Sequence, residues 1–243
     1  MNDIEHLKMI YSGFLNDEDM VREKIKEPNK DYYFVPSLEG TNVIFALNAI
    51  YIEQQILKSK QYFYKAARVA EFMSVKYDRR IIDSGINQIS YALLSDNEEL
   101  IRRFSVLKNS INDDTNIGYQ LPNAVQNTLL EDWDKLDWNI RCLERFVKFP
   151  QFKWHSPVLD VFTGFKEKDE GLVKKGLEEL INTHKKRNKD PLICKFFSTD
   201  TAGYTKLAWI KGYRIELNNS LVPNELMPVE PLSEYPDYDF LKL

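Results

Sequence analysis

The sequence predicts an all-α protein built from stacked antiparallel helix pairs, with an extended C-terminal strap. Three observations predict this class. Apolar residues recur at helical spacing along almost the whole chain. No proline lies between Pro36 and Pro122, whereas four of the 10 prolines fall within the last 21 residues. A helix–turn–helix pattern also occurs more than once.

The first half of the chain contains several apolar stripes. Residues 43–52 are apolar on nearly all sides and predict a central helix that is covered on several faces. Asp96 precedes the acidic stretch NEEL and is the expected N-cap of the helix that follows. The stripes are Tyr62, Ala66, Val69, Ala70 and Met73; then Ile82, Ile86, Ile89 and Leu93; then Leu100, Phe104 and Leu107.

The segment 108–121, KNSINDDTNIGYQL, is polar and lacks apolar periodicity. We interpret it as a long surface loop within a single helical domain that spans residues 1–243. A division between two helical halves at this loop is the alternative.

The second half begins with a longer stripe formed by Trp133, Leu136, Ile140, Leu143 and Val147. Ser156 followed by Pro157 indicates a helix start, because proline is favoured at the first helical position. Thr199 or Asp200 is the expected cap of the helix that carries Tyr204 and Trp209. The short stretches at 192–197 and 213–217 are interpreted as helix ends or extended connectors.

A basic run, HKKRNK at 184–189, ends the predicted helix 171–188. Cations complement the negative end of a helix dipole, so a solvated helix end explains the run. A phosphate or nucleic-acid site is the alternative.

The sequence contains a degenerate internal repeat. SDNEELIRRFSVL at 95–107 resembles EKDEGLVKKGLEEL at 167–180, and in both a polar turn leads into an acidic helix start. Helix pairs of this kind stack side by side. The sequence therefore predicts a degenerate tetratricopeptide-like array rather than a regular solenoid.

Net charge, cysteine spacing and the length of apolar segments limit the functions that are expected of this protein. The net charge of −4 argues against a nucleic-acid partner and suits a partner with a basic face. Cys142 and Cys194 form no CxxC motif and are expected to be buried free thiols in a reducing cytoplasm. Neither a signal peptide nor a segment of bilayer length is recognisable, so a cytoplasmic protein without membrane contact is expected. Composition does not indicate an oligomeric state.

No catalytic or metal motif is present in the sequence. The three histidines His6, His155 and His184 lie far apart and show no metal-ligand spacing. His155 precedes a helix start, where a capping or surface role is favoured over that of a catalytic base. Nucleophile-elbow and phosphate-binding glycine motifs are also missing. The sequence therefore predicts a protein that is not an enzyme and needs neither cofactor nor metal.

The second half also carries a family resemblance. LDVFTGFKEKDEGLVKKGLEELINTHKKR is followed by TDTAGYTKLAWIKGYRIELNNSLVPNELMPVEPL. This order resembles the bacterial polymorphic-toxin immunity proteins of the Immunity protein 49 family. The resemblance covers residues 85–235 and is most specific at 157–232, whereas the first 80 residues are compatible but not distinctive. Immunity proteins of DNase toxins have a similar layout and are an alternative.

The resemblance implies a cytoplasmic protein that binds the effector domain of a cognate toxin and blocks it, without catalytic residues or a cofactor. It transfers no binding residue by position. The competing hypothesis is a helical-repeat adaptor or regulator that binds a peptide in a concave groove.

The tail after Ser220 is predicted to be extended, because its prolines exclude helix. We expect 221–243 to form the strap, with 221–233 lying back across the helix pairs and covering an open end of the stack. The last stretch, EYPDYDFLKL, is alternatively free to meet a partner. The apolar anchors are Leu221, Val222, Leu226, Met227, Val229 and Leu232.

A partner-binding surface is predicted around Trp138. This residue lies about 140° from Trp133 around a helix and therefore falls off the core-facing stripe. Tryptophan is enriched in binding hot spots, and the neighbouring acids suit a basic partner. We predict contacts from Trp138, Asp134 and Asp137, within a negative field to which Glu131 and Asp132 contribute. Packing of Trp138 against the next helix pair is the alternative.

Overall fold

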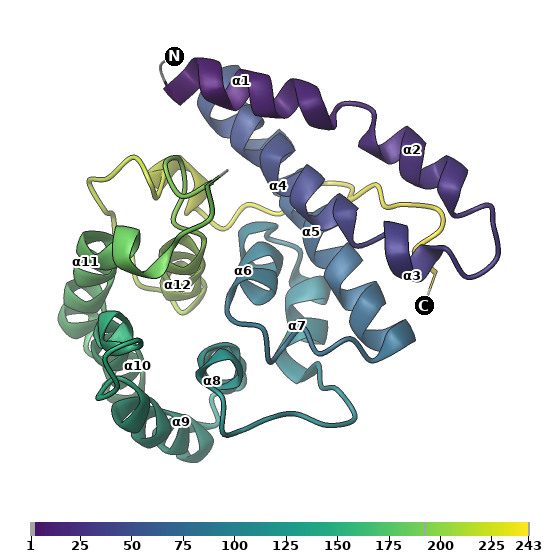
Figure 1. Cartoon of the computed structure of the whole chain (residues 1–243). Coiled ribbons are helices and arrows are strands. Elements are labelled where there is room, and N and C mark those ends of the chain that lie inside the picture. The colour runs from purple at the N-terminus through teal and green to yellow at the C-terminus, as the bar shows by residue number, and fades with distance from the viewer. Residues whose placement is uncertain (1–2, 192, 243) are drawn as a thin grey trace.

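The computed structural model describes residues 3–191 and 193–242, and within these residues it contains helices and no β-strand (Figure 1). The predicted all-α class is confirmed. A π-helix follows α4 at Ala49–Glu53, and 3-10 helices lie at Lys153–His155 and Asn224–Leu226. The α-helices are α1 (Asp3–Phe14), α2 (Asp17–Lys24), α3 (Asp31–Phe34), α4 (Ser37–Asn48), α5 (Ile56–Tyr77), α6 (Asn87–Leu94), α7 (Glu98–Val106), α8 (Ile117–Leu130), α9 (Trp133–Phe146), α10 (Pro157–Glu167), α11 (Glu170–Arg187) and α12 (Thr199–Ile210).

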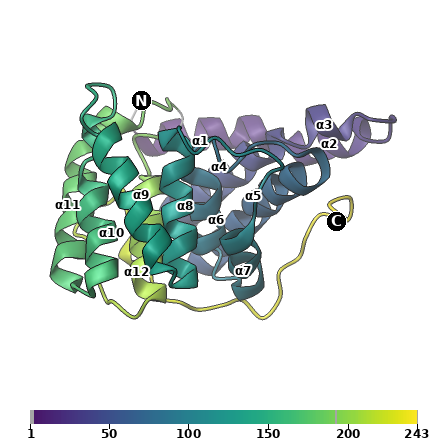
Figure 2. The ribbon, with the colours of Figure 1, turned by 90° about the horizontal axis from the view of Figure 1, so that it is seen from below.

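Helices α8, α9, α10 and α11 form a curved row, with α12 on its inner side and α6 beside α8 (Figure 1). Seen from below, the members of this row stand side by side (Figure 2). Consecutive helices pair as hairpins, α4 with α5, α8 with α9, and α10 with α11. The chain thus forms stacked helix pairs, and α12 returns to pack against α6.

Three interhelical turns share one design. In each, a residue adopts the left-handed conformation with φ of 57° or 58°, and the next residue caps the following helix. The capping side chain accepts a hydrogen bond from the backbone N–H three residues later, which satisfies a free helix donor. The residue pairs are Asp96 with Asn97, Glu131 with Asp132, and Lys168 with Asp169. The repeat seen in the sequence corresponds to the first and third of these turns.

Two predicted caps are wrong, that of α7 by one residue and that of α12 by one or two. Asn97, not Asp96, caps α7, and its Oδ1 accepts from Leu100 N at 2.8 Å. Ser198 occupies the N-cap position of α12, so Thr199 and Asp200 lie inside the first turn. Asp200 still accepts from the Thr201 N–H at 2.7 Å, because a carboxylate in the first turn also reaches free donors.

The predicted loop 108–121 is shorter than expected, because α8 begins at Ile117. Asn116 caps α8 by accepting from Gly118 N at 2.9 Å. Pro122 lies inside the helix. Because proline lacks the backbone N–H and usually interrupts a helix, its presence concealed the start of α8 in the sequence. Asn109 ties the loop to α5 through a 3.0 Å bond from its Nδ2 to Ser74 Oγ.

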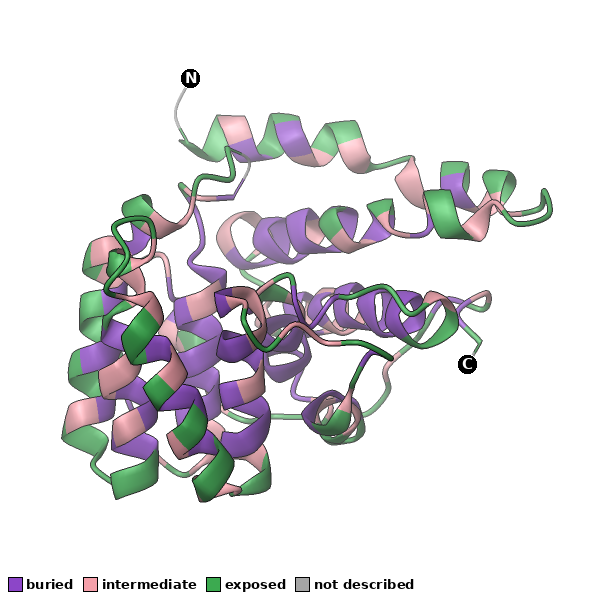
Figure 3. Ribbon diagram, turned by 60° about the horizontal axis from the view of Figure 1, so that its bottom comes forward, coloured by how far each residue is buried: buried purple, intermediate pink, exposed green. Residues whose placement is uncertain are grey.

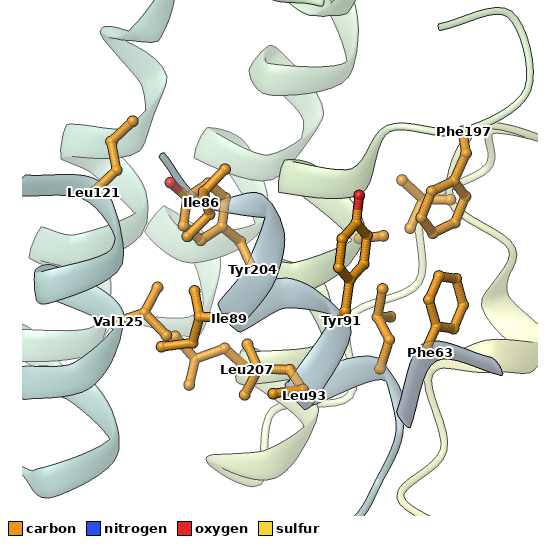
Figure 4. Close-up of a cluster of buried hydrophobic side chains, with 14 of the residues drawn as sticks. Phe63, Ile86, Ile89, Tyr91, Leu93, Leu121, Val125, Phe197, Tyr204 and Leu207 are labelled. Carbon is orange, nitrogen blue, oxygen red and sulfur yellow. The ribbon is translucent and has the colours of Figure 1, made fainter. Parts of the chain in front are cut away.

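The main core surrounds α6, as Figure 4 shows. The side chains of α6 pack against Leu121 and Val125 of α8, Tyr204 and Leu207 of α12, and Phe63 of α5. Buried residues occupy the inward faces of the outer helices and most of the circumference of the central ones (Figure 3). The predicted burial of 43–52 is confirmed for most of its apolar residues.

The α6–α12 contact requires a glycine. A Cβ atom added at Gly203 would lie 2.1 Å from Ser90 Oγ, well inside contact distance. The two helices can therefore approach this closely only because residue 203 has no side chain.

A buried charge cluster joins α5, α6–α7 and α12 to the tail. Lys60, Asp96 and Lys206 are completely buried. The Asp96 carboxylate lies 2.7 Å from Lys60 Nζ and 2.6 Å from Lys206 Nζ. Burial lowers the pKa of Lys206 to about 8, although Asp96 favours the charged form. The cluster thus places two lysine ammonium groups against a single carboxylate.

The tail supplies the remaining partners of this cluster. Lys206 Nζ donates to the carbonyl oxygens of Leu226, Met227 and Pro228 at 2.9 to 3.1 Å. Lys60 Nζ donates to the carbonyl oxygens of Pro228 and Glu230, both at 3.2 Å. Glu230 N in turn donates to Asp96 at 3.1 Å. An irregular, proline-rich backbone is thus bound by buried side chains rather than by secondary structure.

The strap follows one edge of the helices from α12 towards α3 (Figure 2). Val222, Leu226 and Met227 are fully buried, whereas Val229 is 41% exposed. The alternative of a free EYPDYDFLKL stretch is wrong for its described residues, because Tyr238 and Leu241 are buried.

These two tail residues belong to a second hydrophobic cluster, which α5 shares with the N-terminal helices. Its buried members are Val21, Val35, Leu38, Val69, Phe72, Met73, Tyr238 and Leu241. Arg68 fixes the tail there, with Nε 2.7 Å from Asp237 and Nη2 3.0 Å from the Leu241 carbonyl oxygen.

Truncation after Ser220 is expected to lower the melting temperature substantially or to give insoluble protein. Each fully buried apolar side chain of the strap contributes about 1.5–3 kcal/mol, and both lysine ammonium groups lose their carbonyl partners. Thermal unfolding of the truncated and full-length chains tests this. Equal melting temperatures would show that the strap contributes no stability.

Replacing Asp96 by alanine is expected to cost about 3–5 kcal/mol, because two buried ammonium groups would lose their counter-charge. Asn97→Ala removes only a helix cap and should cost about 1 kcal/mol. Urea unfolding of both variants measures the difference. A similar, small cost for the two variants would show that the Asp96 carboxylate contributes little to stability.

Candidate partner-binding surface

Trp138 lies on the outer face of α9 and is 42% exposed. Leu136 and Leu143 on the inner face are completely buried, and Ile140 nearly so, as the apolar stripe predicts. The structure therefore does not bury Trp138 against the next helix pair. Its exposure matches the geometric part of the prediction, and contact with a partner stays a prediction.

Trp138 forms one wall of an apolar recess of about 410 Å³. The recess continues along the helix face through Cys142 and Phe146 to Phe149, which is 52% exposed. Asp114 and Thr115 from the preceding loop and Arg145 complete its lining. Residues 138, 142, 146 and 149 are spaced as a second helix face, so this stripe could have been found in the sequence.

Three of the four predicted acids are matched by cations. Glu131 pairs with Lys211, Asp132 with Lys135, and Asp137 with both Lys166 and Arg141. Hydrogen bonding from Lys166 lowers the pKa of Asp137, and bonding from Lys211 lowers that of Glu131. The pairing of Asp132 with Lys135 and of Asp137 with Arg141 could be inferred from the sequence, because these partners lie three and four residues apart at α9. Lys166 lies on α10 and Lys211 directly after α12, so these two partners could not be foreseen from spacing along α9.

Asp134 differs from these acids. It is exposed and forms no ion pair with any residue that the structure describes. Asp132 is also occupied as the cap of α9, where it accepts from Lys135 N at 3.2 Å. The predicted negative field is therefore much weaker than the sequence suggests, and the apolar recess is the stronger feature of this surface.

The basic run at 184–189 is not a solvated helix end throughout. His184 is buried, and its Nε2 lies 2.8 Å from the Cys194 carbonyl oxygen. The Arg187 side chain is 2% exposed and forms an ion pair with Asp200 of α12. Residues 184 and 187 are one turn apart and face the protein, whereas Lys185 and Lys186 are exposed.

His155 and Arg187 line a cleft of about 300 Å³ near the start of α12. Burial lowers the pKa of His155 to about 4, and the charge of Arg187 acts in the same direction. His155 is therefore a neutral, half-buried side chain, in contrast to the capping or surface role expected from the sequence. Cys142 and Cys194 are free but only half-buried, so full burial of these thiols was also wrong.

Two properties of the described residues concern ligands and membranes. They contain no group of three or more histidine, cysteine, aspartate or glutamate side chains placed to hold a metal ion. None of the helices among residues 3–191 and 193–242 is both long and apolar enough to cross a bilayer.

The fold and this surface define a class: an all-helical array of hairpins with an exposed tryptophan on the outer face of α9. The family model for Immunity protein 49 matches residues 53–226. The chain belongs to the Immunity protein 49 family, as the resemblance in its second half predicted. No curated protein and no solved structure matches the chain.

The match begins earlier than the resemblance indicated, at the last residue of the π-helix. It ends at Leu226, the first tail residue that binds Lys206. The three capped turns and α9 lie inside the matched range, whereas α1 to α4 and the tail after Leu226 lie outside it.

The titration of His155 gives a measurable pH dependence. In an unfolded chain its pKa is about 6.5, above the folded value of about 4. The unfolded state then binds more protons between these values, so stability falls as pH drops from about 6.5 towards 4. His155→Gln should flatten this part of the curve when unfolding free energies are compared across pH. Parallel curves would mean that His155 titrates alike in both states.

Proposed function

We propose that this protein neutralises a cognate bacterial toxin, or the effector domain of a secretion system, by binding to it directly in the cytoplasm. Membership of the Immunity protein 49 family carries the proposal. It also favours immunity over the competing hypothesis of a general peptide-binding adaptor. In this proposal the protein is not an enzyme, and it blocks the toxin by occupying a surface that the toxin needs.

We further propose that the toxin binds around the recess beside Trp138. Large exposed apolar surfaces on soluble proteins often mark interaction sites, and tryptophan is prominent among residues that dominate binding energy. Trp138 and Phe149 present such a surface next to Asp114 and Asp134. A toxin that places an apolar side chain in the recess and a basic side chain near Asp134 would fit both features. Glu131, Asp132 and Asp137, already paired, would act at the periphery.

Deletion of the gene tests the proposed function. Cells should lose viability when the gene is removed, and removal of the neighbouring toxin gene should restore it. Normal growth of the single deletion, in cells shown to make the active toxin, would refute the immunity function.

The double variant Trp138→Ala with Asp134→Lys tests the proposed surface. We expect loss of protection and at least about a 30-fold weaker affinity for the toxin, since a hot-spot residue contributes about 2 kcal/mol or more. Isothermal titration calorimetry and a toxin co-expression assay measure these effects. Because Trp138 is partly exposed, the melting temperature should change little.

The matched control is Met20→Ala with Asp19→Lys on α2, which also removes an exposed apolar residue beside an exposed acid. It should protect fully. Full protection by the Trp138 double variant would place the toxin elsewhere on the protein. A stability loss of about 3–5 kcal/mol would instead indicate that Trp138 is a packing residue.

A further inference from the structure

A second apolar groove, of about 570 Å³, lies where α7, the ends of α8 and α12, and the tail meet. Leu130 is 50% exposed and Val229 is 41% exposed in this groove. Val106, which follows the lining residue Ser105 in α7, is 57% exposed. The apolar lining consists of Ile101, Leu129, Leu130, Trp209, Ile210 and Val229.

Two arginines border this groove without an acidic partner. Arg102 and Arg214 are both exposed and line it, and neither forms an ion pair with a carboxylate of the described residues. The Arg214 guanidinium lies 4.9 Å from the centre of the Trp209 ring and donates to the Trp209 carbonyl oxygen at 3.0 Å. A guanidinium held on an aromatic face still has free N–H donors for a carboxylate.

The acids at the groove do not balance these arginines. Asp96 also lines the groove, but its carboxylate is fully buried and bound to Lys60 and Lys206. Glu98 is the exposed carboxylate among the lining residues. The rim therefore carries an excess of positive charge, which is complementary to an acidic ligand.

The wall of the groove is held in place before anything binds. Val229 stands between Pro228 and Glu230, whose carbonyl oxygens both accept from Lys60. Glu230 N is also bound to Asp96. A wall fixed in this way loses little conformational entropy on binding, which favours a specific complex.

We propose that this groove binds an acidic, apolar segment of a protein partner. Apolar side chains of the segment fill the space beside Trp209, and its carboxylates pair with Arg102 and Arg214. A protein segment fits better than a small molecule, because one ligand has to supply apolar groups beside Trp209 and carboxylates for arginines on two separate elements, α7 and the segment after α12. The site is separate from the Trp138 recess and does not depend on the immunity function.

Two synthetic peptides test the charge preference of the groove. One alternates leucine and phenylalanine with glutamate, and the other has lysine in place of each glutamate. Fluorescence anisotropy should show binding of the glutamate peptide to the full-length protein and much weaker binding of the lysine peptide. The double variant Arg102→Glu with Arg214→Glu should lower the affinity for the glutamate peptide about ten-fold or more and raise the affinity for the lysine peptide.

The matched control is Lys185→Glu with Lys186→Glu on α11, which makes the same change in net charge at exposed residues that line neither the groove nor the Trp138 recess. It should leave binding of the glutamate peptide close to that of the unaltered protein. Leu130→Ser should lower the affinity for the glutamate peptide, and the protein should still prefer this peptide to the lysine peptide. Circular dichroism checks that each variant is folded. Failure of the glutamate peptide to bind, or equal effects of the two double variants, would overturn the proposal.

Discussion

The contact between the Asp96 carboxylate and the ammonium groups of Lys60 and Lys206 is the interaction on which the arrangement of the chain depends. It joins the α6–α7 turn to α5 and α12 in a place that water does not reach. Burying these charges is costly, and one carboxylate cannot balance two cations. Backbone carbonyl oxygens of the tail complete the coordination. The position of the tail is therefore set by the need to solvate buried ammonium groups.

The helices of the hairpins also pack closely, because their connecting turns are short and glycines lie at the contact between α10 and α11. Left-handed turn residues followed by Asn or Asp caps allow short connections, which keep successive helices antiparallel. Glycines then let the helices approach, since a Cβ at Gly164 would meet Val173 at 2.7 Å and one at Gly176 would meet Val161 at 2.7 Å. The strap then runs along one edge of these helices, from α12 towards α3. The hairpins and the strap therefore form one packing arrangement.

The segments outside the family match are packed against one another. Val21, Val35 and Leu38 from the N-terminal helices meet Tyr238 and Leu241 of the tail on the surface of α5. Each segment therefore covers apolar surface of the other. This explains why the last residues of the described tail are buried, although their sequence is polar and rich in proline.

The sequence by itself indicated the helical class, the helix pairs and the family, and it placed Trp138 off the core-facing stripe without deciding whether another helix covers it. The class, the pairs and the position of Trp138 follow from local spacing, which repeats every few residues and needs no distant partner, whereas the family follows from a resemblance in the order of motifs in the second half. It could not identify Asp96 as a buried anion, because the lysines that pair with it lie on α5 and α12. It also overestimated the acidity around Trp138, because Lys166 on α10 and Lys211 directly after α12 reach those acids. Only the tertiary structure decided which charges meet, since electrostatic energy depends on separation and burial in space rather than on distance along the chain.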